Sequence, residues 1–98
     1  MPRSGSEKLA WLWRNGFVVL EMRAHEQVEH VTPKVFPKNT ADFLFKELAR
    51  TRELAPGAVA RVIVPYQSSS ASGDQWILFL VRVVRRFVLP DEWRFQEE

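Results

Sequence analysis

The strongest local signal in this 98-residue chain is the stretch KLAWLWRNGFVVLEMR, residues 8–23. Its centre, Asn15-Gly16, suits the positive φ angles of a two-residue hairpin turn, and apolar residues flank it on both sides. With Arg14 opposite Phe17, one face of the hairpin gathers large apolar cross-strand pairs: Trp13 with Val18, Trp11 with Leu20 and Leu9 with Met22. We therefore predict a β-hairpin here, whose second strand continues with Ala24 and Val28 facing inward and Arg23, His25, Gln27 and Glu29 facing outward.

The segment after this hairpin has the periodicity of a helix. Thr32-Pro33 and Phe36-Pro37 end the second strand, because proline lacks a backbone donor and disfavours helix in the residue before it. Asn39 or Thr40 can cap a helix over residues 41–54, which Pro56-Gly57 ends. The apolar stripe of this helix consists of Ala41, Leu44, Phe45 and Leu48.

Two further strands follow, at residues 59–66 and 75–89, and Pro90 ends the second of them. A short turn over residues 91–95 then lays Trp93 or Phe95 on the core. The predicted fold is α+β, a four-stranded antiparallel sheet with one helix in the order β-β-α-β-β. Residues 1–98 suffice for a single domain, since a chain of this size buries about two-thirds of its unfolded surface. We expect a flexible N-terminus at residues 1–7 and a mobile, serine-rich loop at residues 68–74.

Composition excludes several classes of protein. The chain has no cysteine, which excludes disulfide scaffolds, thiolate zinc sites and cysteine nucleophiles, and we expect no cofactor and no metal. No run approaches the roughly 20 apolar residues of a spanning helix, so we expect no membrane association. The N-terminal residues lack the pattern of a secretory signal, which indicates a cytoplasmic protein. Charge is uneven, because residues 34–86 carry nine basic and four acidic side chains and residues 87–98 carry one and four.

The sheet has an unusual second apolar face. Strand parity assigns one set to the face under the helix: Leu9, Trp11, Trp13, Val18, Leu20, Met22, Val62, Val64, Ile77, Phe79, Val81 and Val83. The other face receives Leu12, Phe17, Val19, Val59, Ile63, Trp76, Leu78, Leu80, Val84 and Val88. A large exposed apolar area marks an interaction surface. The alternative is that the connection at residues 30–38 and the C-terminal segment cover this face within one copy of the chain.

Three arginines support a second hypothesis. Arg61, Arg82 and Arg86, together with Trp76 and the serine-rich loop, have the residue types that meet phosphates and stack bases. The alternative is a charge pattern that keeps strand edges from aggregating, with Glu21, Glu26, Glu29 and the acidic tail as partners. No RNA-binding motif accompanies these arginines.

Catalysis has less support in the sequence. His25 and His30 point to opposite faces of a strand, so they do not form an acid–base pair or a metal site, and the expected place of His25 is beside Glu21 and Glu29. No base is placed to activate a serine. A metal-independent nuclease with His25 as its base is the third hypothesis.

The leading hypothesis is a non-enzymatic protein–protein interaction module. It describes a small homodimeric regulatory or inhibitor-type protein that uses the outer sheet face, with Ile63, Trp76, Leu78 and Leu80 at the interface. The partner is a second copy or another protein. The alternative is a nucleic-acid-binding protein that uses Arg61, Arg82 and Arg86.

Overall fold

The computed structural model describes residues 2–66 and 75–93. The helices and strands are α1 Gly5–Arg14, β1 Val18–Ala24, β2 Gln27–Val31, α2 Lys38–Leu48, β3 Glu53–Leu54, β4 Val59–Tyr66, β5 Gln75–Val83 and β6 Phe87–Val88. Two short 3-10 turns, η1 Pro33–Val35 and η2 Asp91–Trp93, complete the described elements. The predicted α+β class and four-stranded antiparallel sheet are confirmed, but the described residues hold two α-helices rather than one, so the predicted order is wrong.

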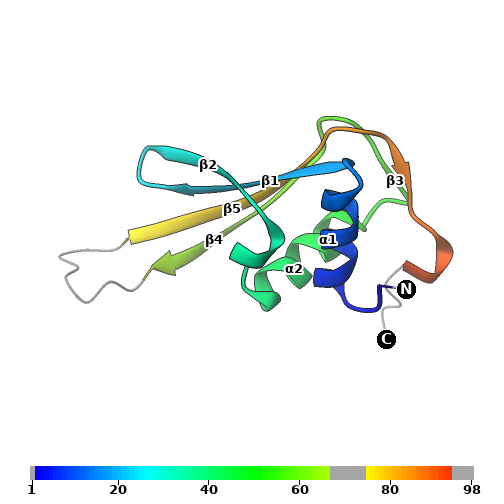
Figure 1. Cartoon of the computed structure of the whole chain (residues 1–98), viewed down its shortest axis with the longest axis horizontal. Helices are drawn as coiled ribbons and strands as arrows, with labels where there is room; N and C mark the ends of the chain where they lie inside the picture. Colours follow the sequence, from blue (N-terminus) through cyan, green and yellow to red (C-terminus); the bar gives the residue numbers. More distant parts are fainter. Residues whose placement is uncertain (1, 67–74, 94–98) are drawn as a thin grey trace.

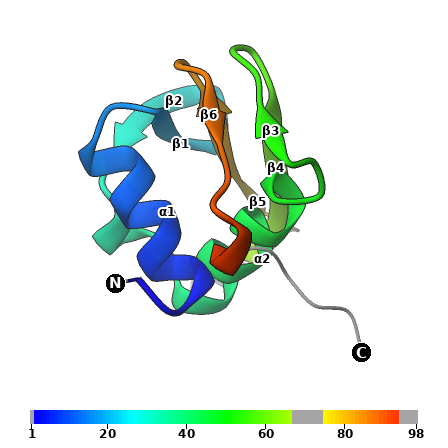
Figure 2. The same ribbon diagram turned by 90° about the vertical axis from the view of Figure 1, so that its right-hand side faces the viewer.

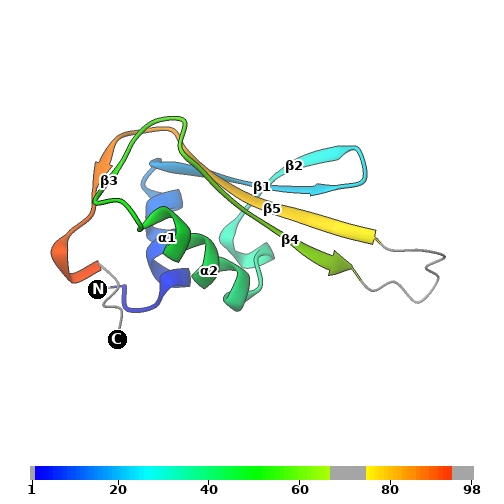
Figure 3. The same cartoon turned by 180° about the vertical axis from the view of Figure 1, so that it is seen from behind.

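The main sheet has the strand order β2-β1-β5-β4, and every neighbouring pair is antiparallel. Both helices lie on one side of this sheet (Figure 1), and the short pair β3-β6 lies beside one end of it (Figure 2). In the view from behind, β4 forms an edge of the sheet with α2 beneath it (Figure 3). The opposite face of the sheet, called here the outer face, has no described helix over it.

The predicted hairpin over residues 8–23 is wrong, because its first half is the helix α1. Ser4 caps this helix by accepting a hydrogen bond from the Glu7 N–H at 3.1 Å, so α1 begins within the segment 1–7 that was expected to be flexible. Asn15-Gly16 ends the helix instead of turning a hairpin. The Phe17 N–H donates to the Leu12 carbonyl at 2.9 Å and the Gly16 N–H donates to the Trp13 carbonyl at 3.1 Å, which is the Schellman arrangement.

The hairpin that does form joins β1 to β2 through His25 and Glu26. Ala24 pairs with Gln27, and His25 adopts a left-handed φ of 58°. The prediction that the strand continues straight from Arg23 to Glu29 is therefore wrong. As a result, His25 lies in an exposed turn rather than beside Glu21 and Glu29. A left-handed backbone outside glycine is uncommon, and histidine is among the residues that tolerate it best, which is why no standard turn signal marks this site.

The predicted apolar stripe of α2 is confirmed, because Ala41, Leu44, Phe45 and Leu48 are all buried. The predicted bounds are wrong at both ends. Asn39 and Thr40 lie inside the helix, which begins after Pro37, and the helix ends at Leu48 rather than at residue 54. Residues 50–53 are exposed and offer no apolar side chain to the core, whereas Leu54 is buried through the pairing of β3 with β6.

Strand β4 has the predicted bounds, but the predicted strand over residues 75–89 breaks after Val83. The N–H groups of Val84 and Arg85 both donate to the Phe17 carbonyl, at 2.8 and 3.2 Å, which forms a β-bulge. The bulge redirects the chain into β6. Val84 and Val88 are exposed there, beyond the main sheet, so their predicted place on its second face is wrong.

The core lies between the helices and the inner face of the sheet. Leu12 belongs to it and is fully buried, so its predicted place on the second face is wrong, and Trp13, predicted to be inward-facing, is 36% exposed. At one end an aromatic cluster closes the core, with ring centroids 5.4 Å apart for Trp11 and Trp93 and 4.7 Å apart for Phe17 and Phe87. The predicted packing of Trp93 on the core is confirmed. Phe95 and the predicted loop at 68–74 lie outside the described residues.

Candidate binding face of the sheet

The outer face is a grid whose rows follow from strand register. One row places His30, Glu21, Leu80 and Arg61 side by side across β2, β1, β5 and β4. The row toward the β1–β2 turn contains Val28, Arg23, Leu78 and Ile63, and Trp76 pairs with Pro65 one step farther out. On the other side, Val19, Arg82 and Val59 form a row. The face therefore carries three arginines, one histidine and one glutamate among apolar side chains.

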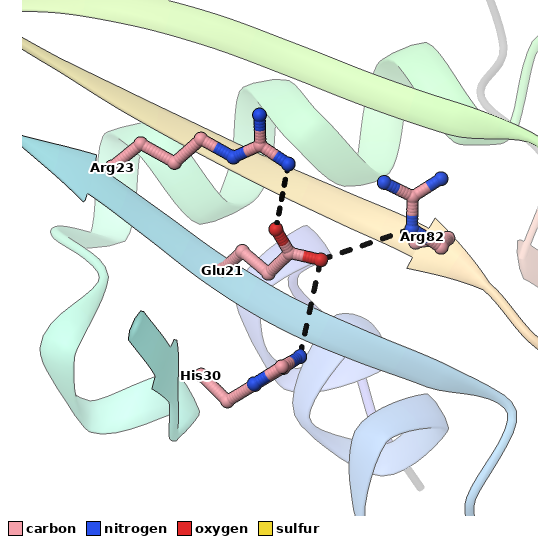
Figure 4. Close-up of polar contacts among 4 residues, drawn as sticks. All are labelled: Glu21, Arg23, His30 and Arg82. Carbon is pink, nitrogen blue, oxygen red and sulfur yellow. Dashed lines mark hydrogen bonds and ion pairs between the residues drawn. The ribbon is translucent and has the colours of Figure 1, made fainter. Parts of the chain in front are cut away.

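Glu21 organises the centre of this grid. Its side chain is 7% exposed, and Arg23 Nη2 donates a hydrogen bond to its Oε1 at 3.1 Å. The other carboxylate oxygen, Oε2, lies 3.8 Å from Arg82 Nε and 4.0 Å from His30 Nε2, so three basic side chains surround a single acid (Figure 4). Because the arginine side chains are about 40% exposed, their outer parts still reach solvent. The arrangement fixes the positions of two guanidinium groups and leaves a net positive face.

The end of the face nearest the β1–β2 turn is apolar and open. Ile63 is 58% exposed, Trp76 54% and Val28 52%. Scattered single apolar side chains are ordinary on protein surfaces, but Ile63 and Trp76 both adjoin the partly buried Leu78, and Val28 lies in the same row as Ile63, on the far side of Arg23. Ile63, Trp76 and Leu78 therefore form an exposed apolar patch beside Arg23, and Val28 lies across that arginine.

Leu80 lies on this face but is only 4% exposed. The register places Glu21 and Arg61 beside it, while Leu78 and Arg82 flank it along β5. The long aliphatic stems of arginines cover apolar neighbours while their charged ends stay in water, which accounts for this burial without a helix above. Leu80 is thus covered by its neighbours on the face. The exposed members of the predicted interface are Ile63 and Trp76.

The predicted arginine set is only partly assembled. Arg61 and Arg82 lie on the outer face, on the neighbouring strands β4 and β5, and are two residues apart in register. Arg86 lies outside the main sheet, next to β6, and forms an ion pair with Glu53 of β3, so its predicted grouping with Arg61 and Arg82 is wrong. The β-bulge causes this, because it ends the side-chain alternation that the prediction carried from Arg82 to Arg86.

Two residues of the face, Arg23 and His30, were not among the predicted contacts. The β1–β2 turn brings His30 opposite Glu21, whereas the pairing of β1 with β5 places Arg23 beside Leu78. Arg23 and Glu21 share parity in one strand, and this spacing was a readable signal for their ion pair. The place of His30 depends on register, which the sequence does not mark.

A separate hollow lies against α1. It is a cavity of about 390 Å³ lined by Ala10, Trp13, Arg14, Thr32, Pro33 and Lys34. Trp13 and two cationic residues line it, but it holds no acid–base pair. It is the other surface of the described chain where an exposed tryptophan and basic residues occur together.

No group of three or more histidine, aspartate or glutamate side chains is arranged for a metal ion among the described residues. Within the same residues, neither helix has the length and apolar character needed to cross a bilayer. No protein-family model, curated protein or solved structure matches this chain.

Proposed function

We propose that this chain is a non-enzymatic interaction protein that binds another protein through the outer face of its sheet. The observation that carries the proposal is an exposed apolar patch, Ile63 and Trp76 around Leu78, beside three arginines, Arg23, Arg61 and Arg82, on a face that no described helix covers. Protein interfaces combine apolar anchors with arginine in this way, and tryptophan and arginine are enriched among the residues that contribute most binding energy.

Charge favours an acidic partner over a second copy. A face-to-face homodimer would bring the arginines of both copies together, while each Glu21 already pairs within its own chain. Like charges in contact oppose association. The homodimer stays a prediction, and sedimentation equilibrium tests it directly: a monomeric mass at high protein concentration excludes it.

The side chains at the centre of the outer face favour a protein over a nucleic acid as the partner. The centre of the face is a buried carboxylate beside a buried leucine, rather than aromatic rings on which bases stack. The aromatic residue on the face, Trp76, lies at one end of it. Salt-sensitive binding of single-stranded oligonucleotides that is lost in Arg61→Ala and Arg82→Ala would favour the nucleic-acid alternative instead.

Photo-crosslinking in the cell of origin tests the proposal. A photoreactive phenylalanine analogue replaces Ile63 or Trp76 on the outer face, and matched controls carry it at Phe43, which is 42% exposed on α2, and at Trp13. We expect a discrete protein adduct from positions 63 and 76 that disappears when Arg23 and Arg82 are changed to glutamate. Adducts only from position 43 or 13, or adducts to nucleic acid, would contradict the proposal.

A further inference from the structure

The strand β4 is a long edge whose outward hydrogen-bonding groups can be assigned. At its start, the Gly57 N–H donates to the Val83 carbonyl and the Val83 N–H donates to the Ala58 carbonyl, both at 2.8 Å. Hydrogen-bonded pairs alternate along an antiparallel ladder, so the next such pair is Ala60 with Val81. The N–H and carbonyl groups of Val59, Arg61 and Ile63 therefore point away from β5.

No strand in the described part of the chain pairs with this outward edge. Pro65 belongs to the same outward set and lacks an N–H, which is the position where an edge strand tolerates proline. The edge thus offers three donors and four acceptors along eight residues of strand. The other edge strand, β2, has five residues and carries Glu29 and His30.

The side chains at the β4 edge favour a negatively charged binding segment. Arg61 is exposed and makes no ion pair with any residue that the structure describes, unlike Arg23 and Arg82, which share Glu21. On the same face, two residues along β4, Ile63 is 58% exposed. A strand added beside β4 would place one of its side chains opposite Arg61 and another opposite Ile63, since residues two apart share a face.

We infer that β4 binds an extended acidic segment of the partner as an additional strand of the sheet. This inference rests on the proposed function, whose binding face the added strand would extend. A carboxylate of the segment lies opposite Arg61, an apolar side chain lies opposite Ile63, and the outward N–H and carbonyl groups of β4 complete the ladder.

Arg61 and Pro65 also fit a second role, because charges and prolines on edge strands keep copies of a protein from pairing. The two roles are compatible. An arginine in the middle of the edge opposes pairing with a second β4 that places its own Arg61 opposite, and it attracts a segment that places a carboxylate there. Rejection of like charge and selection of opposite charge come from the same side chain.

The test measures fluorescence anisotropy with labelled eight-residue peptides in which glutamate and valine alternate at every second residue, so that both lie on one face of the added strand, and threonine occupies the positions between them. The control peptide has lysine in place of glutamate, and a third peptide carries N-methyl groups on alternate amides along the edge that would pair with β4. We expect the glutamate peptide to bind about tenfold more tightly than the lysine peptide. Arg61→Glu reverses this preference, and N-methylation abolishes binding because it removes donors without changing the side chains.

Ile63→Pro is the matched change in the protein. It removes an outward N–H and leaves the β4–β5 hydrogen bonds in place, since Pro65 occupies an equivalent position, and we expect it to abolish peptide binding. The N-methylated peptide keeps the test valid if this variant does not fold. Equal binding of the N-methylated and unmodified peptides, or no peptide binding at all, overturns strand addition. The proposed function then survives if crosslinking at positions 63 and 76 still yields a protein adduct, and fails with it if crosslinking yields none.

Discussion

Glu21→Gln is the most informative single change, because Glu21 is the one acid among the described residues of the outer face and it lies within 4.0 Å of three basic side chains. Glutamine keeps an oxygen that accepts the hydrogen bond from Arg23, which is 3.1 Å long, but removes the charge that faces Arg82 and His30. Those partners are largely solvated, so each pair contributes about 0.2–1 kcal/mol. These two pairs sum to a loss of about 0.4–2 kcal/mol in the free energy of unfolding, and the melting temperature of a domain this size falls by roughly 4–8 °C per kcal/mol.

Thermal unfolding followed by circular dichroism measures this loss. Glu47→Gln is the matched control, because Glu47, near the C-terminus of α2, pairs with a single arginine, Arg50, just beyond the helix, and one such exposed pair contributes about 0.2–1 kcal/mol. The change at Glu21 should also strengthen binding of the glutamate peptide, since it removes the negative charge from the face. If Glu21→Gln is no more destabilising than Glu47→Gln, Glu21 does not organise the arginines of the outer face.

Three further changes test the fold that supports the face. Asp42→Ala removes the carboxylate that accepts a 2.6 Å hydrogen bond from the Ser6 N–H in the first turn of α1, and should cost about 1–2 kcal/mol in urea unfolding, whereas Asp42→Asn should recover most of it. Gly16→Ala places a side chain at a φ of 79° and should lower the free energy of unfolding by about 1–2 kcal/mol. Gly16→Asn should lower it less, because asparagine tolerates this left-handed conformation, and equal losses would contradict the left-handed end of α1. Trp93→Ala should cost about 3–5 kcal/mol and remove near-ultraviolet dichroism, because Trp93 is 4% exposed against Trp11; unchanged spectra would contradict the aromatic cluster.

The error over residues 8–16 has a clear physical origin. Leu9 and Leu12 are buried three residues apart, which is helical spacing, but tryptophans at 11 and 13 also satisfy alternation. Asn15-Gly16 suits a hairpin turn and equally suits a helix C-terminus, since both need a positive φ. The deciding signal was upstream, because Ser4 followed three residues later by Glu7 is the sequence of a capping box.

The predicted alternation of side chains within β4 and β5 was not affected by this error. Ile63, Trp76, Leu78 and Leu80 share the outer face as predicted, because alternation in β4 and β5 is a local property of each strand. What could not be predicted was non-local. The pairing of His30 with Glu21 depends on a turn without a standard signal, and the departure of Arg86 depends on a bulge that forms against the Phe17 carbonyl.

The two helices do not extend along the whole sheet. The β1–β2 hairpin and the far ends of β4 and β5 project beyond them (Figure 1), so Gln27 and Glu29 are exposed on the side that elsewhere covers the core. Strands with few buried neighbours open locally, and their amide hydrogens exchange with solvent without unfolding of the whole domain. Exchange should therefore be fast at Ala24 and Val64 and slowest at Leu20 and Val81, where the sheet lies over the helices. Protection that appears at the projecting end when a partner binds would report the site of binding from the main chain alone.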